Sequence, residues 1–229
     1  MRVAVLVTGG KDSALALYYV LKEGYDVKYL ASMIPLREDS WMFHYPNMWL
    51  VDLFAEAAGV PLVKAETDAV GEKEVEDLKR LISSLDVDGV VSGAVASDYQ
   101  KTRIEGICKE IGIKCVAPLW HRDPLVILNE ILELKLDVII TAVSAYGFDK
   151  AWLRRKIDEK AVKDLAKLNR LYGVSIVGEG GEYETLVLDA PFLRKRIHIV
   201  NAETVWKGQG GYLKITKAEL QNKWRKSML

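Results

Sequence analysis

The hydrophobic positions of the chain follow two alternating spacings over its first two thirds. Short apolar or β-branched runs, typical of strands buried on both faces, occupy residues 3–7, 27–34, 62–65, 89–92 and 114–117. Between these runs, apolar residues recur at the three- and four-residue spacing of amphipathic helices, at residues 12–23, 48–58, 72–85 and 99–111. Strands that alternate with helices at this pitch predict a doubly wound α/β domain with a parallel sheet.

The pattern changes after Pro118. Helices are predicted at residues 124–134 and 158–172, and strands at residues 137–143, 174–177, 185–189, 196–200, 203–207 and 212–216. The second helix stops at Gly173, a residue type that commonly ends helices. Residues 217–229 are expected to form a loosely held helix. We therefore expect two domains, residues 1–122 and a smaller α+β domain of residues 123–229.

Composition limits the class of partner. The 229 residues include 32 basic and 32 acidic side chains, so the formal net charge is zero. Proteins that bind nucleic acid along its backbone usually carry a basic excess, so we expect no stable nucleic-acid binding. The first apolar run breaks at Gly9-Gly10 and no run of about 18 apolar residues follows, so we expect no signal peptide, no membrane span and a cytoplasmic location. Cys108 and Cys115, the two cysteines, are expected to fill the core.

The strongest local signal is a polar loop between the first predicted strand and the first predicted helix. It consists of Thr8, Gly9, Gly10, Lys11, Asp12 and Ser13. Backbone N–H groups at a helix start form an anion site, and two glycines let phosphate oxygens approach the backbone. Lys11 adds a positive charge, and Asp12 is a candidate magnesium ligand. The spacing fits neither the common phosphate loop nor the dinucleotide fingerprint, and a plain Gly-Gly turn is the alternative.

This loop resembles the S-G-G-x-D-S pyrophosphate loop of the ATP pyrophosphatases, with Thr8 in place of the first serine. The resemblance implies a Rossmann-like domain of the adenine nucleotide α-hydrolase type that cleaves ATP between its α and β phosphates. Alone it leaves several subfamilies open, among them tRNA-modifying, amidotransferase and NAD-synthesising enzymes.

Further motifs narrow the choice. In chain order they are MFHYPN at 42–47, SGAVASDYQ at 92–100 with Arg103, PLW at 118–120 and GEGGEYET at 178–185. Together they resemble the diphthine–ammonia ligase family over essentially the whole chain. Its usual A-x-G-L-D element departs conservatively here, with Phe148 in place of the leucine. The resemblance implies that ATP and ammonia amidate diphthine on translation elongation factor 2 through an adenylated carboxylate, giving diphthamide, AMP and pyrophosphate.

The resemblance also implies roles for individual residues. The predicted catalytic groups are Lys11, Asp12, His44 and Glu182. The predicted ATP-binding residues are those of the loop together with Ser92, Gly93, Gln100 and Arg103. The predicted substrate-binding residues are His44, Asn47, Trp120, Glu179, Gly180, Gly181, Glu182, Tyr183 and Glu184. A quaternary ammonium group, as in diphthine, favours anions and aromatic faces.

Simpler explanations exist for most of these residues. The 97–100 segment can be an ordinary N-capped helix start, Asn47 can cap the helix after it, and His44 can be a surface histidine. The three glutamates can form a solvated acidic turn. Another pyrophosphate-loop enzyme, acting on a tRNA base or small metabolite, is the alternative function, and a non-catalytic nucleotide sensor is a third.

Residue content suggests a nitrogen source and leaves the oligomeric state open. The chain has no N-terminal cysteine nucleophile and no room for a glutamine-hydrolysing domain, so free ammonia is the expected nitrogen donor. Six tryptophans leave room for an aromatic interface, which keeps a homodimer open.

Overall fold

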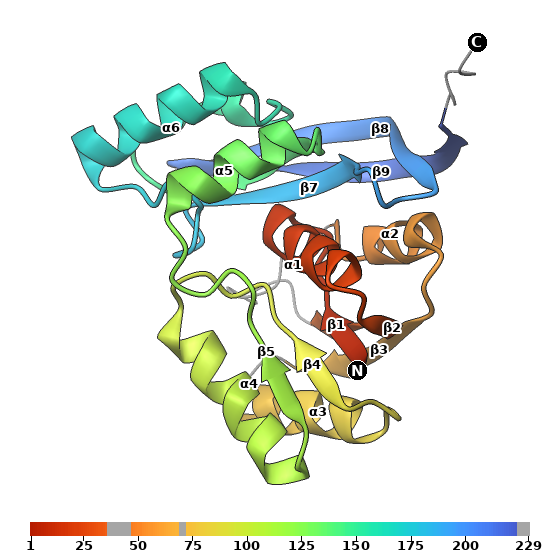
Figure 1. The fold of residues 1–229 in the computed structure, drawn as a ribbon. Helices are drawn as coiled ribbons and strands as arrows, with labels where there is room; N and C mark the ends of the chain where they lie inside the picture. Colours follow the sequence, from red (N-terminus) through yellow and green to blue (C-terminus); the bar gives the residue numbers. More distant parts are fainter. Residues whose placement is uncertain (36–46, 69–71, 224–229) are drawn as a thin grey trace.

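The computed structural model describes residues 1–35, 47–68 and 72–223. Its first half is a parallel sheet with the strand order β3-β2-β1-β4-β5. The strands are β1 (Arg2–Leu6), β2 (Asp26–Pro35), β3 (Leu62–Thr67), β4 (Gly89–Val91) and β5 (Lys114–Val116). The helices that connect them are α1 (Lys11–Lys22), α2 (Leu50–Ala58), α3 (Glu72–Ser83) and α4 (Asp98–Ile111). The doubly wound α/β prediction is therefore confirmed (Figure 1).

The second half forms an antiparallel sheet with the strand order β7-β6-β9-β8. Its strands are β6 (Asp137–Val143), β7 (Tyr183–Asp189), β8 (Lys195–Lys207) and β9 (Gly210–Asn222), and its helices are α5 (Pro124–Glu133) and α6 (Glu159–Tyr172). A short 3-10 turn, η2 (Lys150–Trp152), precedes α6. Since this half combines helices with an antiparallel sheet, the predicted smaller α+β part is also confirmed.

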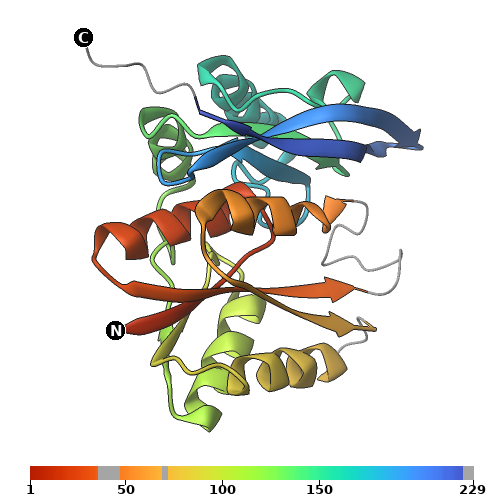
Figure 2. The same cartoon turned by 90° about the vertical axis from the view of Figure 1, so that its right-hand side faces the viewer.

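The two sheets are stacked, with α1 and α2 between them. Both views show α5 and α6 on the outer face of the antiparallel sheet, and α3 and α4 on the outer face of the parallel sheet (Figures 1 and 2). The middle of β1 and the consecutive residues 14–17 of α1 are fully buried, and one hydrophobic cluster runs from them into the second sheet. Because the core is shared, a division at residue 122 into two domains stays a prediction.

Three local predictions are wrong. Residues 174–177 are not a strand, because their carbonyls accept hydrogen bonds from side chains: Val174 O from Asn169, Ile176 O from Tyr183 and Val177 O from Lys11. The two strands predicted at 196–200 and 203–207 form the single strand β8, whose register is irregular at Asn201.

The third error concerns the tail. Residues 217–222 continue β9 instead of starting a helix, because they pair with Lys195–Asn201 at the beginning of β8. The remainder of the predicted helix, residues 224–229, lies outside the described residues. None of the helices in the described parts of the chain is long and apolar enough to cross a membrane.

Candidate active site

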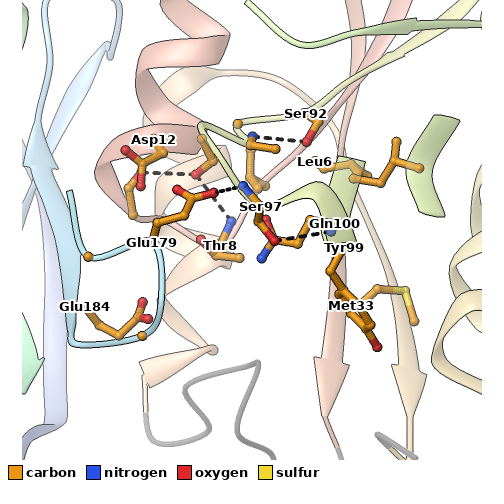
Figure 3. A pocket seen from close by; sticks show the side chains of 18 of the residues that line it. Leu6, Thr8, Asp12, Met33, Ser92, Ser97, Tyr99, Gln100, Glu179 and Glu184 are labelled. Atoms are coloured by element: carbon orange, nitrogen blue, oxygen red, sulfur yellow. Dashed lines mark hydrogen bonds between the residues drawn. The ribbon is translucent and has the colours of Figure 1, made fainter. Parts of the chain in front are cut away.

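The site lies where the strand order of the parallel sheet reverses. The chain leaves β1 in one direction, toward β2, and β4 lies on the other side of β1, so a crevice opens beyond the carboxyl ends of β1 and β4. A cavity of about 450 Å³ occupies this position. Its walls come from the loop before α1, the loop before α4, the start of α3 and the 178–185 segment of the second half (Figure 3).

The predicted phosphate loop turns sharply at the first of its two glycines. Gly9 has a φ of 82°, in the left-handed region that favours glycine. Ser13 Oγ accepts a hydrogen bond from Thr8 N at 3.5 Å and donates one to Gly10 O at 3.1 Å, so the loop closes on itself. Closed in this way, the loop lines the cavity with Thr8, Gly10, Asp12 and Ser13.

Strand β7 holds the loop from the other side. Val187 N donates to Gly9 O at 2.9 Å, and Lys11 N donates to the Thr185 hydroxyl at 3.1 Å. Gly93 packs against the same turn, because a Cβ on Gly93 would lie 2.9 Å from the backbone carbon of Asp12. The loop is therefore fixed by both halves of the chain.

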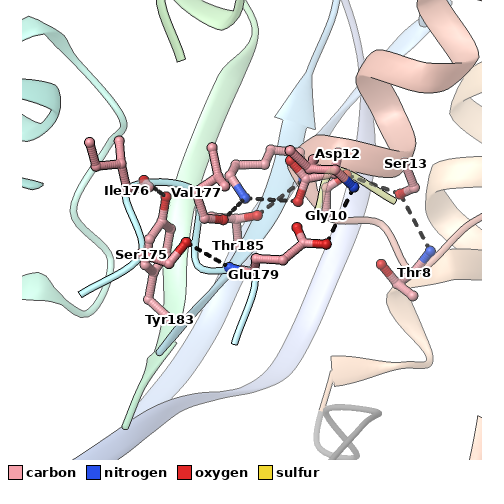
Figure 4. A network of polar contacts seen from close by, with 12 residues as sticks. Thr8, Gly10, Asp12, Ser13, Ser175, Ile176, Val177, Glu179, Tyr183 and Thr185 are labelled. Atoms are coloured by element: carbon pink, nitrogen blue, oxygen red, sulfur yellow. Dashed lines mark hydrogen bonds and ion pairs between the residues drawn. The ribbon is translucent and has the colours of Figure 1, made fainter. Parts of the chain in front are cut away.

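Lys11 points toward the second half. Its side chain is 3% exposed, and Nζ donates to Asp12 Oδ2 at 2.8 Å and to Val177 O at 2.5 Å (Figure 4). Nζ also lies 5.2 Å from the centre of the Tyr183 ring. Burial lowers the pKa of Lys11, but Asp12, Tyr183 and Glu184 together raise it by more, so the net pKa is raised and the ammonium stays charged.

The two carboxylate oxygens of Asp12 differ in their contacts, since Oδ2 accepts the hydrogen bond from Lys11. Oδ1 is buried and has no hydrogen-bond partner within the described residues. Burial raises the pKa of this carboxyl, against the opposing effect of Lys11. A buried carboxylate oxygen without a partner is suited to a cation. No group of three or more His, Cys, Asp or Glu side chains in the described residues is arranged to hold a metal, so any cation there would need further oxygens from a ligand.

The acidic motif is a folded loop and not a solvated turn. Glu182 accepts hydrogen bonds from Ser175 N at 3.1 Å and Gly180 N at 2.8 Å. Tyr183 is 2% exposed, and its hydroxyl donates to Ile176 O at 2.7 Å, with its pKa raised by burial. Gly180, Gly181 and Glu184 line the cavity. Glu179 also lines it and accepts from the backbone of the loop before α4.

The opposite wall is formed by the start of α4. Ser97 caps this helix, since its hydroxyl accepts from Gln100 N at 3.3 Å. The guanidinium carbon of Arg103 lies 3.2 Å from the centre of the Tyr99 ring, and Arg103 Nη1 is buried without a hydrogen-bond partner among the described residues. Ser92 is 5% exposed and accepts from Ala94 N. A buried, unpartnered guanidinium nitrogen beside a cavity is suited to an anionic ligand.

Sequence reasoning missed the apolar part of the cavity. It is lined by Leu6, Ala31, Met33, Val75, Leu78 and Ile104, with Glu74 beside them. Their spacing marks them as interior positions of strands and helices, and the sequence carries no sign that one edge of the core is open. Burial raises the pKa of Glu74, while Arg103 lowers it.

Three predicted substrate-binding residues of the described structure do not line the cavity: Asn47, Trp120 and Glu182. Asn47 Nδ2 donates to Leu213 O at 2.7 Å and its Oδ1 accepts from Ile215 N at 3.0 Å, so its side chain pairs with the backbone of β9. Trp120 packs with His121, at 4.3 Å between ring centres, and Lys101 Nζ lies 4.9 Å from its ring. Another predicted substrate-binding residue, His44, lies outside the described residues.

Comparisons with known proteins agree with this architecture. The diphthamide synthase N-terminal domain matches residues 1–115, and the diphthamide synthase C-terminal domain matches residues 123–221. A protein of Danio rerio named diphthine--ammonia ligase is 36% identical over 251 residues, which covers 97% of this chain and 98% of that protein. The protein of the same name from Mus musculus is 33% identical and covers 97% of this chain and 94% of its own length.

The human protein of that name is 34% identical over 227 residues and covers 90% of this chain and 85% of its own length. The two matched regions lie on either side of the linker between the two sheets. Residues of both regions line the cavity. The chain belongs to the diphthamide synthase family.

Proposed function

We propose that this chain catalyses the ATP-dependent amidation of diphthine on translation elongation factor 2, with ammonia as the nitrogen donor. The products would be diphthamide, AMP and pyrophosphate. The relatives described above carry the name of this activity, and membership of the family supports it.

One observation carries the proposal. A single cavity joins the glycine-rich loop of the first half to the acidic motif of the second half. Within it, Asp12 Oδ1 and Arg103 Nη1 are buried polar atoms without hydrogen-bond partners among the described residues. Such atoms are costly unless a ligand satisfies them, so the residues present fit a ligand that carries both phosphate groups and a cation.

ATP fits the two ends of this cavity. The loop residues that line the cavity, among them Thr8 and Gly10, would hold the β and γ phosphates at the start of α1. Ser92, Gly93 and the apolar wall, including Met33 and Ile104, would take the ribose and the purine. The cavity volume of about 450 Å³ lies in the range usual for sites of small ligands.

The chain would activate a carboxylate, which is a poor acyl donor. In the first step, a diphthine carboxylate oxygen would attack the α-phosphorus and pyrophosphate would leave. In the second step, ammonia would attack the acyl carbon, lose a proton, and release AMP. The residues would contribute positioning and charge: Arg103 beside the developing negative charge, and the loop amides on the departing pyrophosphate.

We also propose that Asp12 contributes to a magnesium site. Its free Oδ1 would contribute one oxygen, and the remaining ligands would be phosphate oxygens and water, the set this ion prefers. When bound, the ion would neutralise phosphate charge. The predicted catalytic role of Glu182 is less direct in this geometry, because both its carboxylate oxygens already hold the motif loop together.

The trimethylammonium group of diphthine would meet the acidic wall at Glu184, which lines the cavity with Gly180 and Gly181. Roles for His44 and Trp120 in the bound complex stay predictions, as do the homodimer and the cytoplasmic location. Size-exclusion chromatography with light scattering and cell fractionation measure the last two.

The test is a reconstituted reaction. Elongation factor 2 that carries diphthine would be incubated with the purified chain, ATP and ammonium, and AMP, pyrophosphate and the intact mass of the factor would be measured. AMP and pyrophosphate should form only when the factor and ammonium are both present. The test variant is Asp12→Asn, which should abolish turnover. The matched control is Asp26→Asn, which changes an exposed aspartate that does not line the cavity and should leave turnover intact. Formation of ADP would contradict the proposal.

A further inference from the structure

Glu179 is bound by the main chain of the opposite half. Its Oε1 accepts hydrogen bonds from three consecutive backbone N–H groups, those of Val95, Ala96 and Ser97, at 3.3, 3.0 and 2.8 Å. These donors lie at the N-terminus of α4, where converging N–H groups attract an anion. The anion that they hold here comes from the same chain (Figure 3).

The position of Glu179 is fixed at its backbone as well. Glu179 N donates to Ser175 Oγ at 3.2 Å, within a loop that Glu182 closes through Ser175 N and Gly180 N. Gly178, the preceding residue, has a φ of 70° and lies so close to Tyr183 that a Cβ would be 2.7 Å from Tyr183 O. The side chain therefore extends toward the first half from a rigid base (Figure 4).

Lys11 makes the opposite connection. It starts from the first half and reaches Val177 O in the second, two residues from Glu179 along the chain. Two charged side chains thus cross the junction in opposite directions, and both residues line the cavity. Both bind backbone groups of the other half, and such charge-assisted hydrogen bonds are among the stronger ones in proteins.

We propose that Glu179 is a positioning residue that holds the 92–100 segment against the 175–185 segment and so sets the width of the cavity. It would act on nucleotide binding through these backbone contacts and not by touching the cationic group of the protein substrate. The inference rests on the proposed function to the extent that the cavity is the ATP site.

The first test needs no substrate. Backbone hydrogen exchange would be measured on the ligand-free chain for Glu179→Ala, Glu179→Gln and the control Glu203→Ala, which removes an exposed carboxylate on β8. Glu179→Ala should speed exchange of the 95–97 amides by about tenfold or more, because it removes their acceptor. Glu179→Gln keeps an acceptor oxygen and should give a smaller increase, and the control should give none. Exchange at the wild-type rate in Glu179→Ala would overturn the inference.

The second test separates positioning from substrate contact. Glu179→Gln should raise the KM for ATP severalfold and leave the KM for the diphthine-carrying factor unchanged. The reverse pattern, an unchanged KM for ATP with a raised KM for the factor, would overturn the inference, because it is the result expected of a carboxylate that binds a cation. Should the wild-type chain fail to amidate the factor, the proposed function is refuted, while the exchange measurement still decides the role of Glu179.

Discussion

Replacement of Lys11 by Met tests whether this lysine supports the junction between the two halves. Methionine keeps the length of an unbranched side chain and removes the ammonium group. In the structure that group is buried, 2.8 Å from Asp12 Oδ2 and 2.5 Å from Val177 O. Lys11→Met therefore leaves a carboxylate without its countercharge and a buried carbonyl without its donor.

The size of the effect follows from these contacts. Removal of one member of a buried ion pair costs about 3–5 kcal/mol. The Asp12 side chain keeps 30% of its exposure, so water compensates part of this loss, and we expect about 2–3 kcal/mol. For a chain of this length the melting temperature should fall by about 4–12 °C, as measured by circular dichroism.

The loss should depend on pH. With Lys11 absent, nothing offsets the burial that raises the pKa of Asp12. A carboxyl with a raised folded-state pKa favours folding below its unfolded pKa, and this contribution is lost as the pH rises through the folded-state value. The deficit of Lys11→Met should accordingly be smaller near pH 4 than near pH 8.

A double-variant cycle supplies the control. Lys11→Met combined with Asp12→Asn should lose less stability than the sum of the two single variants, because the buried unpaired charge is gone. Strictly additive losses, or a Lys11→Met chain that melts at the wild-type temperature at every pH, would refute the reasoning.

Two further predictions concern close packing and surface charge. Gly93→Ala should destabilise the chain by about 1–3 kcal/mol and raise the KM for ATP, because its Cβ would lie 2.9 Å from the backbone of α1. The control Gly106→Ala, whose Cβ would have nothing within 4 Å, should stabilise α4. Equal melting temperatures for the two variants would contradict this prediction. Hydrogen bonds from Arg2 lower the pKa of Asp88 to about 2, so its stabilising contribution is present above about pH 4 and is lost as the pH falls toward 2. Asp88→Asn should flatten the decline of melting temperature over that interval, and an unchanged slope would show that the Arg2–Asp88 pair does not stabilise the fold.

The parallel sheet and the position of the phosphate loop were predictable from the sequence. Continuous apolar runs indicate buried strands. A Gly-Gly turn that follows the first of these strands lies at the carboxyl edge of the parallel sheet. The wrong prediction of a helix in the tail has a different cause. The choice between helix and strand at residues 217–222 depends on pairing with residues 195–201, and such non-local pairing leaves little trace in a short segment.

The contacts that side chains of the site make with distant backbone groups could not be predicted from the sequence, because they are also non-local. Glu179 is held by three amides of the 95–97 segment, and amides are present at almost every position of any sequence. Asn47 is a comparable case, since its side chain matches the backbone of β9. In both, the residue that matters was identifiable, but its partner and therefore its role were not.

The most direct measurement of the central claim uses labelled ammonium. The purified chain, ATP and elongation factor 2 that carries diphthine would be incubated with ¹⁵N-ammonium, and the modified histidine peptide would be sequenced by mass spectrometry. The account predicts one ¹⁵N atom in the side-chain amide of that peptide for each AMP released, and none with Asp12→Asn. Release of AMP without label in the peptide, or label found in tRNA or in a small metabolite instead, would contradict it.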